Sequence, residues 1–474
     1  MNTTLEYYDV FPKIMLVGAE TKVTIRPLGT HVLFDPSEGY TVCILPMRET
    51  LEPNENGDKV PDSKYPWTDA VREGNLLTFT YRFGREQEYL IRMYKKSDVT
   101  RKGATQFRVY AVDADLFERR PYKGDMHAHS TWSDGKESPE IVMASYRKAG
   151  FDFTGLTDHR KHAASVAAID AYKDAAVDMC MCKGEEVHIK GNHVHIVNFG
   201  SEYSVQEFAD ADLNKFKAEV HELADIAKNL QGADFPKGVN RFEYFACLWI
   251  FKRIQEAGGL AIFPHPHWRS NVYHDPEDMT DALFASGAFD AFELLGGVGP
   301  DDNNTQAALY NEARAKGLDL KVVGSSDSHG QINTDYFNWY TTVLFAKDLS
   351  IGGIREAVRS GYSVAVERYP GENARVHGPY RFVSFTLFLL SEYFPVHDEM
   401  CFEEGRQMKE YAVGSMEEAA GPGAPQNATR PEGAAQNATR LEGAAPDVAS
   451  PADVLKMLSG RTKRYLDKIY GKID

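Results

Sequence analysis

The sequence has few of the features that mark a membrane, secreted or nucleic-acid-binding protein. No apolar run reaches the roughly 18 residues that a membrane-spanning helix needs, and the segment FVSFTLFLL at 382–390 is too short. The N-terminus lacks the basic start and apolar core of a signal peptide. The formal net charge of −16 argues against general nucleic-acid binding, which uses a basic surface. We therefore expect a soluble, cytoplasmic protein with no membrane association.

Cysteine is scarce and scattered. The chain has five cysteines, at Cys43, Cys180, Cys182, Cys247 and Cys401. Cys180 and Cys182 stand two apart on an expected strand, so their side chains point the same way. No second pair follows at the spacing of a zinc ribbon. This excludes a zinc-ribbon domain, and we expect reduced thiols.

The 474 residues, 43% of them hydrophobic, suffice for two or three domains. Residues 1–120 contain short segments rich in β-branched and aromatic residues, such as KVTIRPL and QFRVYAV, separated by turn formers such as PNENGD. This pattern predicts a small all-β sandwich-like domain. It carries no cluster of catalytic residue types, so we interpret it as an accessory domain.

From 121 to 370, strand-like segments alternate with helical ones. GDMHAH precedes SPEIVMASYRKAG, and AFDAFELLG precedes TQAALYNEARAKG. Alternation of this kind predicts an α/β domain with a parallel sheet, either closed into a barrel or open and doubly wound. In both cases the active site is expected at the carboxyl ends of the strands.

The C-terminal part divides into three segments. Residues 371–414 are expected to form a helical extension, and 415–450 a low-complexity linker that contains QNATRPEGAA and QNATRLEGAA in succession. The linker has too few large apolar residues to order itself. Residues 451–474 are expected to form a basic amphipathic helix that docks on the body or on a second subunit.

Ligand-type side chains gather at the ends of the expected strands. Twelve of the 15 histidines lie between 127 and 329. Five separate strand ends contribute them together with acids: His127 and His129, then Asp158 and His159, then Glu186 with His195, then His265 and His267, then Asp327 and His329. One histidine at a strand end is usually a hydrogen-bonded surface residue, but the joint pattern indicates a metal site. Imidazole and carboxylate ligands without thiolates suit Zn, Mn or Fe.

These motifs resemble the PHP (polymerase and histidinol phosphatase) family. They are His127-Ala-His129 with Asp134 after it, Thr-Asp-His159, Gly-Glu-Glu186 followed by His-Val-His195, Pro-His265-Pro, and Ser-Asp327-Ser-His329. They occur in family order over about 121–346 and look closest to the branch called CehA/McbA-type. The resemblance implies a distorted (β/α)7 TIM-like barrel with two to three divalent ions.

The resemblance also assigns ligands. One ion would be held by His127, His129, Glu186 and Asp327. Glu186 would bridge to a second ion held by His195 and His265, and a third would be held by Asp134, His159 and His329. Asp158 is expected to support the site from behind the ligands. Relatives often follow Thr-Asp-His with Asp or Asn, whereas this chain has Arg160, Lys161 and His162, so we expect the rim of its pocket to differ from theirs.

Metal-activated hydroxide is the expected nucleophile. Arg160, Arg269 and Lys136 follow the ligand motifs and could clamp a phosphate, and His267 could donate a proton to the leaving group. The leading prediction is a phosphoesterase for a small phosphomonoester or a nucleotide-like phosphodiester. The alternatives are a carboxylic ester, amide or carbamate hydrolase and a non-catalytic metal-binding scaffold. The sequence leaves metal identity and oligomeric state open.

Two neighbouring acids in KGEEV receive different roles. Successive side chains on a strand point to opposite faces, so only one of Glu185 and Glu186 enters the site. The family match places Glu186 inward, and Glu185 is then expected to face the helical layer or solvent. If that position is exposed, Glu185→Gln is expected to change stability by no more than about 0.5 kcal/mol.

Overall fold

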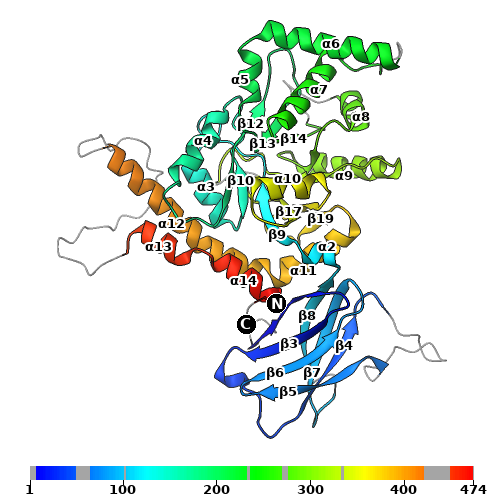
Figure 1. The fold of residues 1–474 in the computed structure, drawn as a ribbon, viewed down its shortest axis with the longest axis vertical. Coiled ribbons are helices and arrows are strands. Elements are labelled where there is room, and N and C mark those ends of the chain that lie inside the picture. Colours follow the sequence, from blue (N-terminus) through cyan, green and yellow to red (C-terminus); the bar gives the residue numbers. More distant parts are fainter. Residues whose placement is uncertain are drawn as a thin grey trace.

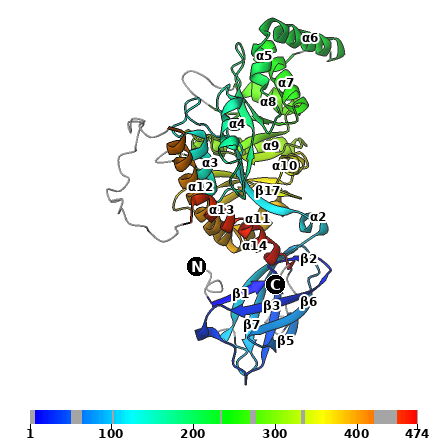
Figure 2. The ribbon, with the colours of Figure 1, turned by 60° about the vertical axis from the view of Figure 1, so that its left-hand side comes forward.

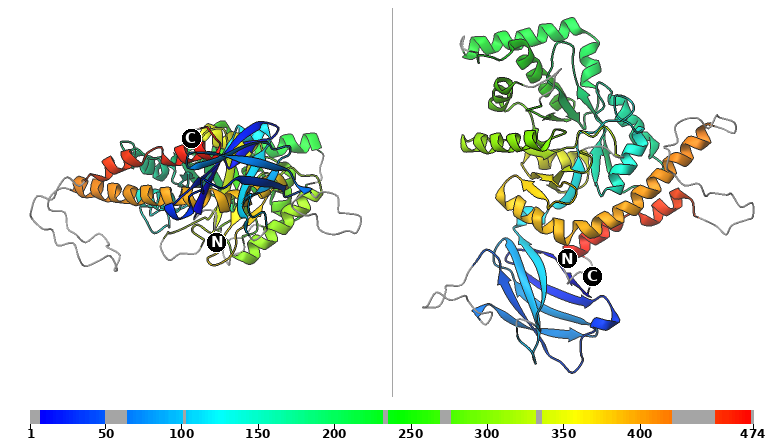
Figure 3. Two further views of the ribbon diagram at one scale, coloured as in Figure 1. Left: turned by 90° about the horizontal axis from the view of Figure 1, so that it is seen from below. Right: turned by 180° about the vertical axis from the view of Figure 1, so that it is seen from behind.

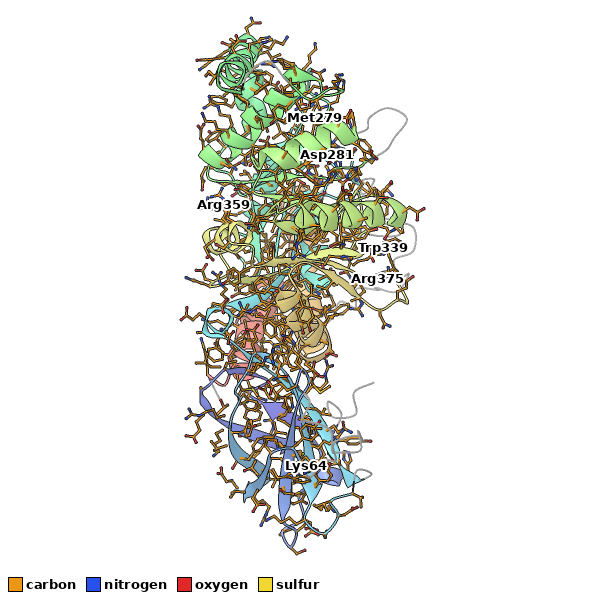
Figure 4. The ribbon with its side chains drawn as sticks, turned by 90° about the vertical axis from the view of Figure 1, so that its right-hand side faces the viewer. Lys64, Met279, Asp281, Trp339, Arg359 and Arg375 are labelled. Atoms are coloured by element: carbon orange, nitrogen blue, oxygen red, sulfur yellow. The ribbon has the colours of Figure 1, made fainter. Side chains whose placement is uncertain are left out.

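The computed structural model describes residues 7–49, 64–100, 103–231, 235–268, 276–331, 336–420 and 449–472. An N-terminal β-sheet, a central α/β unit and a helical C-terminal part lie along one long axis (Figure 1). Figure 4 places Lys64 of the N-terminal part at one end and Met279 and Asp281 of the α/β unit toward the other. Among the described residues, no helix has both the length and the apolar composition to cross a bilayer.

The N-terminal part is one eight-stranded sheet in the order β1-β3-β6-β5-β4-β7-β8-β2. Its strands are β1 (Tyr8–Phe11), β2 (Ile14–Leu16), β3 (Glu20–Pro27), β4 (Tyr40–Pro46), β5 (Trp67–Glu73), β6 (Leu76–Arg82), β7 (Gln87–Lys95) and β8 (Thr105–Val112), with a 3₁₀ turn η1 (Thr30–Val32) and helix α2 (Ala114–Phe117). Alternating burial along β3, with Val23 and Ile25 inward, matches the two-residue period of a strand with one buried face.

This sheet folds over through β5. Residues 67–70 of β5 pair with β4, and residues 71–73 pair with β6. Apolar side chains from both halves then meet in one core that includes Val23, Ile44, Phe79 and Phe107. Where the sequence predicts a sandwich, the structure has a single continuous sheet bent around its core.

The central unit contains two sheets, in the orders β11-β10-β9-β17-β18-β19 and β12-β13-β14-β15-β16. Their strands are β9 (Arg120–Asp125), β10 (Phe153–Gly155), β11 (Cys180–Cys182), β12 (Gly184–Val187), β13 (Ile196–Phe199), β14 (Leu260–Phe263), β15 (Ala291–Leu295), β16 (Val322–Gly324), β17 (Tyr340–Ala346), β18 (Ser363–Glu367) and β19 (Arg375–His377). Isolated bridges join the sheets between Ala128 and Ser328 and between His159 and Glu186.

Helices connect these strands and cover them. They are α3 (Pro139–Lys148), α4 (His162–Ala171), α5 (Val205–Asp210), α6 (Leu213–Gln231), α7 (Arg241–Glu256), α8 (Glu277–Ser286), α9 (Pro300–Ala315) and α10 (Ile351–Arg359). Caps match the sequence: Ser204 accepts a hydrogen bond from the Glu207 N–H of α5, and Asn240 accepts one from the Glu243 N–H of α7. The α/β class is therefore present.

The predicted parallel sheet is wrong for several strands. β9 pairs parallel with β10, and β14, β15 and β16 pair parallel, but β13 is antiparallel to both β12 and β14. β17 is antiparallel to β9 and to β18. The reason at β13 is chain length, because residues 188–195 are fewer than the dozen or more residues that a parallel crossover needs.

The C-terminal part consists of α11 (Tyr380–Glu392), α12 (Phe394–Ala420), α13 (Pro451–Leu458) and α14 (Arg461–Ile469). Helix α12 runs beneath the central unit (Figure 3) and packs against α3. The single helix expected at 451–474 is two helices, separated at Gly460, whose φ of 75° ends the first. The repeat linker falls outside the described residues from 421 to 448.

Helix α14 docks where the N-terminal sheet meets the central unit (Figure 2). Leu466, Ile469 and Tyr470 join a core with Ile14 of β2. The Lys13 N–H donates to the Ile469 carbonyl at 2.8 Å. Buried Lys13 also pairs with Glu392 of α11 at 3.2 Å. The N-terminal sheet, α11 and α14 therefore share one interface.

Candidate metal centre

The predicted ligands surround one cavity of about 460 Å³. Glu186 lies within β12, and the other ligands follow the ends of β9, β10, β14 and β16 or precede β13. The described residues that line the cavity are Asp134, Lys136, His159, Glu186, His195, His265, Trp268, Gly297, Asp327, His329 and Tyr336. His127 and His129 are fully buried directly behind this lining. The structure thus brings all nine predicted ligand residues together.

Four of these residues converge on one point. The Nε2 atoms of His127 and His129 are 3.2 Å apart, and they lie 3.2 and 2.9 Å from Asp327 Oδ1. The same nitrogens lie 3.4 and 3.5 Å from Glu186 Oε2. Ligands at about 2.0–2.1 Å from a tetrahedral metal ion are separated by about 3.3 Å. The observed separations match that spacing.

Glu186 is the central carboxylate of the site. Its Oε1 lies 2.7 Å from His195 Nδ1 and 3.4 Å from His265 Nε2. Its Oε2 lies 2.8 Å from His159 Nδ1, on the side that also faces His127. A carboxylate whose two oxygens face different groups of imidazoles has the geometry required to bridge two cations.

A further group lies at the more exposed side of the cavity. Asp134 is 3.3 Å from His329 Nε2 through Oδ1 and 3.6 Å from His159 Nε2 through Oδ2. His129 Nδ1 also lies 3.8 Å from Asp134 Oδ1. His129, Asp134, His159 and His329 offer ligand atoms close enough to share one ion. His129 therefore lies between two of the three predicted metal-ion positions, with Nε2 toward Asp327 and Nδ1 toward Asp134.

The residues fit a bound cation. Glu186 Oε2 and His159 Nδ1 are buried and only 2.8 Å apart, but neither atom makes a hydrogen bond. Buried polar atoms normally have hydrogen-bond partners, and two unsatisfied donor atoms of these types at this separation fit a cation between them. Imidazole and carboxylate donors are those that Zn, Mn or Fe accept.

The electrostatics of the site reflect close pairing. Burial alone lowers the pKa of His265, but the hydrogen bond and charge of Glu186 outweigh it and raise that pKa to about 9. His329 responds in the same way to burial and to Asp134, with a pKa of about 9. The hydrogen bond with His329 in turn holds the pKa of Asp134 well below its usual range. A cation bound by these residues would replace these protons, so its binding would be accompanied by proton release.

Two ligand residues have unusual backbone conformations. His265 and Asp327 have φ values of 29° and 49°, a region that non-glycine residues rarely occupy. Such conformations persist where the surrounding structure fixes them, and they cluster at functional sites. Gly297 contributes to this at Asp327, because a Cβ at position 297 would lie 2.2 Å from the Asp327 Cβ.

Glu293 supports the site and was missed by sequence reasoning. It is fully buried in β15, with Oε1 2.9 Å from His127 Nδ1. Its Oε2 accepts the backbone N–H of His265 at 3.2 Å. A carboxylate on the outer nitrogen of an imidazole fixes its tautomer and turns the other nitrogen inward. The available signal was a single acid inside the apolar strand AFELL.

Asp158 lies behind the ligands, in line with its expected supporting role. Its carboxylate accepts hydrogen bonds from the N–H and hydroxyl of both Ser130 and Ser133. These serines flank the turn that follows His129. Asp158 therefore fixes the loop that carries the first ligand motif, without facing the cavity.

Of the residues predicted to contact the substrate or to donate a proton, the structure places only some at the cavity. His267 is buried, and Arg160 is exposed with a φ of 59°. Neither side chain is among the described residues that line the cavity. Arg269 lies outside the described residues. Lys136, the remaining cation considered, does line the cavity.

Glu185 does not meet the condition of exposure under which its replacement is expected to have little effect on stability. As predicted, Glu185 points away from the cavity toward the helical layer, but it is fully buried. Its carboxylate accepts hydrogen bonds from the Ser204 hydroxyl at 2.6 Å and from the Val205 N–H at 2.6 Å, at the start of α5. Asn198 Nδ2 donates to it at 3.0 Å. Glu185 thus ties β12 and β13 to α5.

A separate group, formed by Asp152, His397 and Cys401, also has metal-type donors. His397 Nε2 lies 2.8 Å from Asp152 Oδ1 and its Nδ1 lies 3.0 Å from Asp398 Oδ1. Arg147 reaches Asp152 at 3.3 Å. Both imidazole nitrogens already face carboxylates, so this group is a buried ion network that holds α12 on the central unit.

Comparison with known proteins gives similarities of limited extent. No family model matches the chain. A segment of 62 residues is 34% identical to DNA polymerase/3'-5' exonuclease PolX of Bacillus subtilis, and the match covers 13% of this chain and 11% of that protein. The chain thus spans about a tenth of the length of this relative.

Among solved structures, a two-domain protein from Bacteroides vulgatus that contains a predicted PHP-like metal-dependent phosphoesterase is 18% identical. The match covers 52% of this chain and 65% of that one, with a TM-score of 0.36. An amidohydrolase from Chromobacterium violaceum is 20% identical over 44% of this chain and 87% of its own, with a TM-score of 0.29. The CehA/McbA-type branch stays a prediction. The resemblance of the chain to the PHP family lies in its motifs.

Proposed function

We propose that this protein is a metal-dependent phosphoesterase of the PHP type that acts on a small phosphomonoester or a nucleotide-like phosphodiester. The observation that carries the proposal is the convergence of imidazole and carboxylate atoms at 2.7–3.5 Å around Glu186 and Asp327. This convergence occurs inside a cavity of about 460 Å³ that also contains Lys136.

Two to three divalent ions, Zn, Mn or Fe, would be held by the nine-residue set. The first position uses His127, His129, Asp327 and one oxygen of Glu186, the second uses the other oxygen of Glu186 with His195 and His265, and the third uses Asp134, His159 and His329. When bound, such ions supply an activated water nucleophile and neutralise phosphoryl charge. The bridges Ala128–Ser328 and His159–Glu186 join the two sheets beside this set, which supports a distorted (β/α)7 barrel.

The other lining residues indicate how a substrate is oriented. Lys136 is the charged side chain of the described lining that is left after the nine ligands, so it contacts the phosphoryl oxygens. Trp268 lies 5.8 Å from His195 and 5.3 Å from His265 between ring centroids, and Tyr336 also lines the cavity. These rings provide flat apolar surfaces for the remainder of a small substrate.

The position of His267 changes the expected proton donor. His267 does not line the described cavity, so we propose a different proton donor for the leaving group. Among the described lining residues outside the nine ligands, Lys136 and Tyr336 carry a transferable proton. We therefore assign protonation of the leaving group to one of these two.

The proposal is tested with the full chain loaded separately with Mn, Zn and Fe. p-Nitrophenyl phosphate, bis-p-nitrophenyl phosphate and p-nitrophenyl acetate are assayed side by side with Glu186→Gln and with the exposed control Glu202→Gln. We expect turnover of a phosphate substrate that Glu186→Gln abolishes and Glu202→Gln retains. Turnover of the acetate alone would favour the ester, amide or carbamate hydrolase. Metal binding without any turnover would favour the non-catalytic scaffold.

A further inference from the structure

The pair Cys180 and Cys182 has no role in the metal centre. Both residues belong to β11, with Sγ atoms 3.7 Å apart. They lie on the same face because they are two apart on a strand. β11 is the edge strand of its sheet and pairs with β10. The two thiols are thus neighbours on a short strand at a sheet edge.

A second cavity, of about 610 Å³, opens beside this pair. Its lining includes Arg120 and Tyr122 at the start of β9, Asp152 just before β10, and Cys180 at the start of β11. It shares no described lining residue with the metal cavity. The metal ligands follow the ends of β9 and β10, so the two cavities lie at opposite ends of these strands.

The two thiols differ in their access to this cavity. Cys180 lines it and is partly exposed. Cys182 is 3% exposed and packs in a core with Phe153 and Phe199. A reagent that enters the cavity therefore meets Cys180 first, and Cys182 lies directly behind it.

Hydrogen bonding between the thiols adds to this asymmetry. The Cys182 hydrogen bond lowers the pKa of Cys180, despite burial and the charge of Asp348. The same interaction, together with burial, raises the pKa of Cys182 well above its usual value. A thiolate is the reactive form of cysteine, so Cys180 is the more reactive of the two.

We propose that Cys180 is an oxidisable thiol on the wall of this cavity and that Cys182 resolves its oxidised form as an intrastrand disulfide. An accessible thiol next to a buried second cysteine is the arrangement of a peroxide-sensitive pair. Cys43, Cys247 and Cys401 are fully buried, and each lacks a cysteine neighbour close in sequence. The inference is independent of the proposed hydrolase activity.

The oxidant of this reaction is a peroxide, and the disulfide forms in two steps. The Cys180 thiolate attacks one oxygen of hydrogen peroxide, the O–O bond breaks, and Cys180 sulfenic acid and hydroxide form. The Cys182 sulfur then attacks the Cys180 sulfur, the S–O bond breaks, and water leaves with the proton of the Cys182 thiol. Both sulfurs are oxidised and the peroxide is reduced. The Sγ atoms must approach from 3.7 Å to about 2.05 Å, so the disulfide requires a local distortion of the three-residue edge strand β11.

In the test, the folded protein is treated with hydrogen peroxide, digested with trypsin and analysed by mass spectrometry. Trypsin cleaves after Lys173 and after Lys183, so both cysteines lie in one peptide, residues 174–183. We expect this peptide to lose two hydrogens, a change distinct from the added oxygen of oxidised Met179 or Met181. Alkylation of Cys180 should fall roughly tenfold on oxidation and return with dithiothreitol, as for a reversible disulfide.

Variants separate the two roles. Cys182→Ser and Cys182→Ala should accumulate sulfenic acid at Cys180 that dimedone captures, and Cys180→Ser should leave Cys182 unmodified. Cys247 in the same digest is the buried control. A wild-type peptide that keeps both thiols, or that carries only added oxygen on Cys180, would overturn the proposal. The wild-type measurement decides the matter even if a variant folds poorly.

Discussion

Replacing the neighbouring acids Glu185 and Glu186 by glutamine should produce two different defects. Glu185 is a buried carboxylate that accepts hydrogen bonds from the Ser204 hydroxyl, the Val205 N–H and Asn198. Glu186 faces the metal ligands His159 and His195 at 2.8 and 2.7 Å. We expect Glu185→Gln to lose stability and keep metal, and Glu186→Gln to lose metal.

The magnitude at Glu185 follows from its contacts. A hydrogen bond to a charged group contributes about 1.5–3 kcal/mol, and a negative charge at a helix N-terminus adds about 0.3–1 kcal/mol. Glutamine keeps one acceptor oxygen, which offsets part of this loss. We therefore expect Glu185→Gln to lower the free energy of unfolding by about 2 kcal/mol, well above the 0.5 kcal/mol expected for an exposed site.

Urea unfolding and elemental analysis of the two purified variants measure these effects together. Glu185→Gln should have a lower unfolding midpoint, unchanged metal content and near-normal turnover in its folded form. Glu186→Gln should bind less metal and lose activity by orders of magnitude. The reasoning is refuted if Glu185→Gln proves as stable as wild type, or if it is the variant that loses metal.

Four further predictions concern other parts of the molecule. Glu293→Gln should weaken metal binding about 10–100-fold by releasing His127, as measured by competition with a chelator; unchanged affinity would contradict its positioning role. Burial lowers the pKa of His397, but Asp152 outweighs it and raises that pKa well above its usual value, so the pair stabilises the fold fully below about pH 6.5 and this stability is lost as pH rises through the raised pKa. Accordingly, His397→Gln should cost about 3–5 kcal/mol near pH 6 and less near pH 10 in urea unfolding; an equal cost at both values would refute this. Deletion of 421–445 should leave turnover within tenfold, and a larger loss in a folded protein would show that this segment reaches the site. Chelator-free protein should contain two to three metal equivalents by elemental analysis, and less than one after incubation with Mn or Zn would refute the nine-ligand set.

The ligand set could be predicted because its residues occur in short motifs next to strands. His127 and His129 stand two apart after a strand, and the other motifs follow in family order. Because the ends of neighbouring strands meet at one edge of a sheet, these side chains lie around one cavity. The position of His267 could not be derived from its spacing alone. Residues two apart share a face only in an extended chain, and His265 has a φ of 29°.

Other features depended on contacts that a sequence does not display. Glu293 is a lone acid in an apolar strand, and only the fold places it 2.9 Å from His127. The burial of Glu185 arises because α5 begins above β12, which alternation along the strand does not specify. The bent sheet likewise results from β5 exchanging partners midway, and the sequence pattern of a strand does not specify its partners.

The docking of α14 has a consequence for the order of folding during synthesis. Thr462, Lys463 and Leu466 of this helix complete the wall of the cavity that contains Cys180, and Ile469 receives the Lys13 N–H. These residues leave the ribosome after every described strand of the three sheets. Until α14 docks, the surface beside β2 that it covers is exposed, and the cavity lined by Cys180 lacks the side chains that α14 contributes. In the nascent chain this surface and Cys180 are therefore open to oxidants and to aggregation until α14 has been made, and the docking of α14 is the step that covers them.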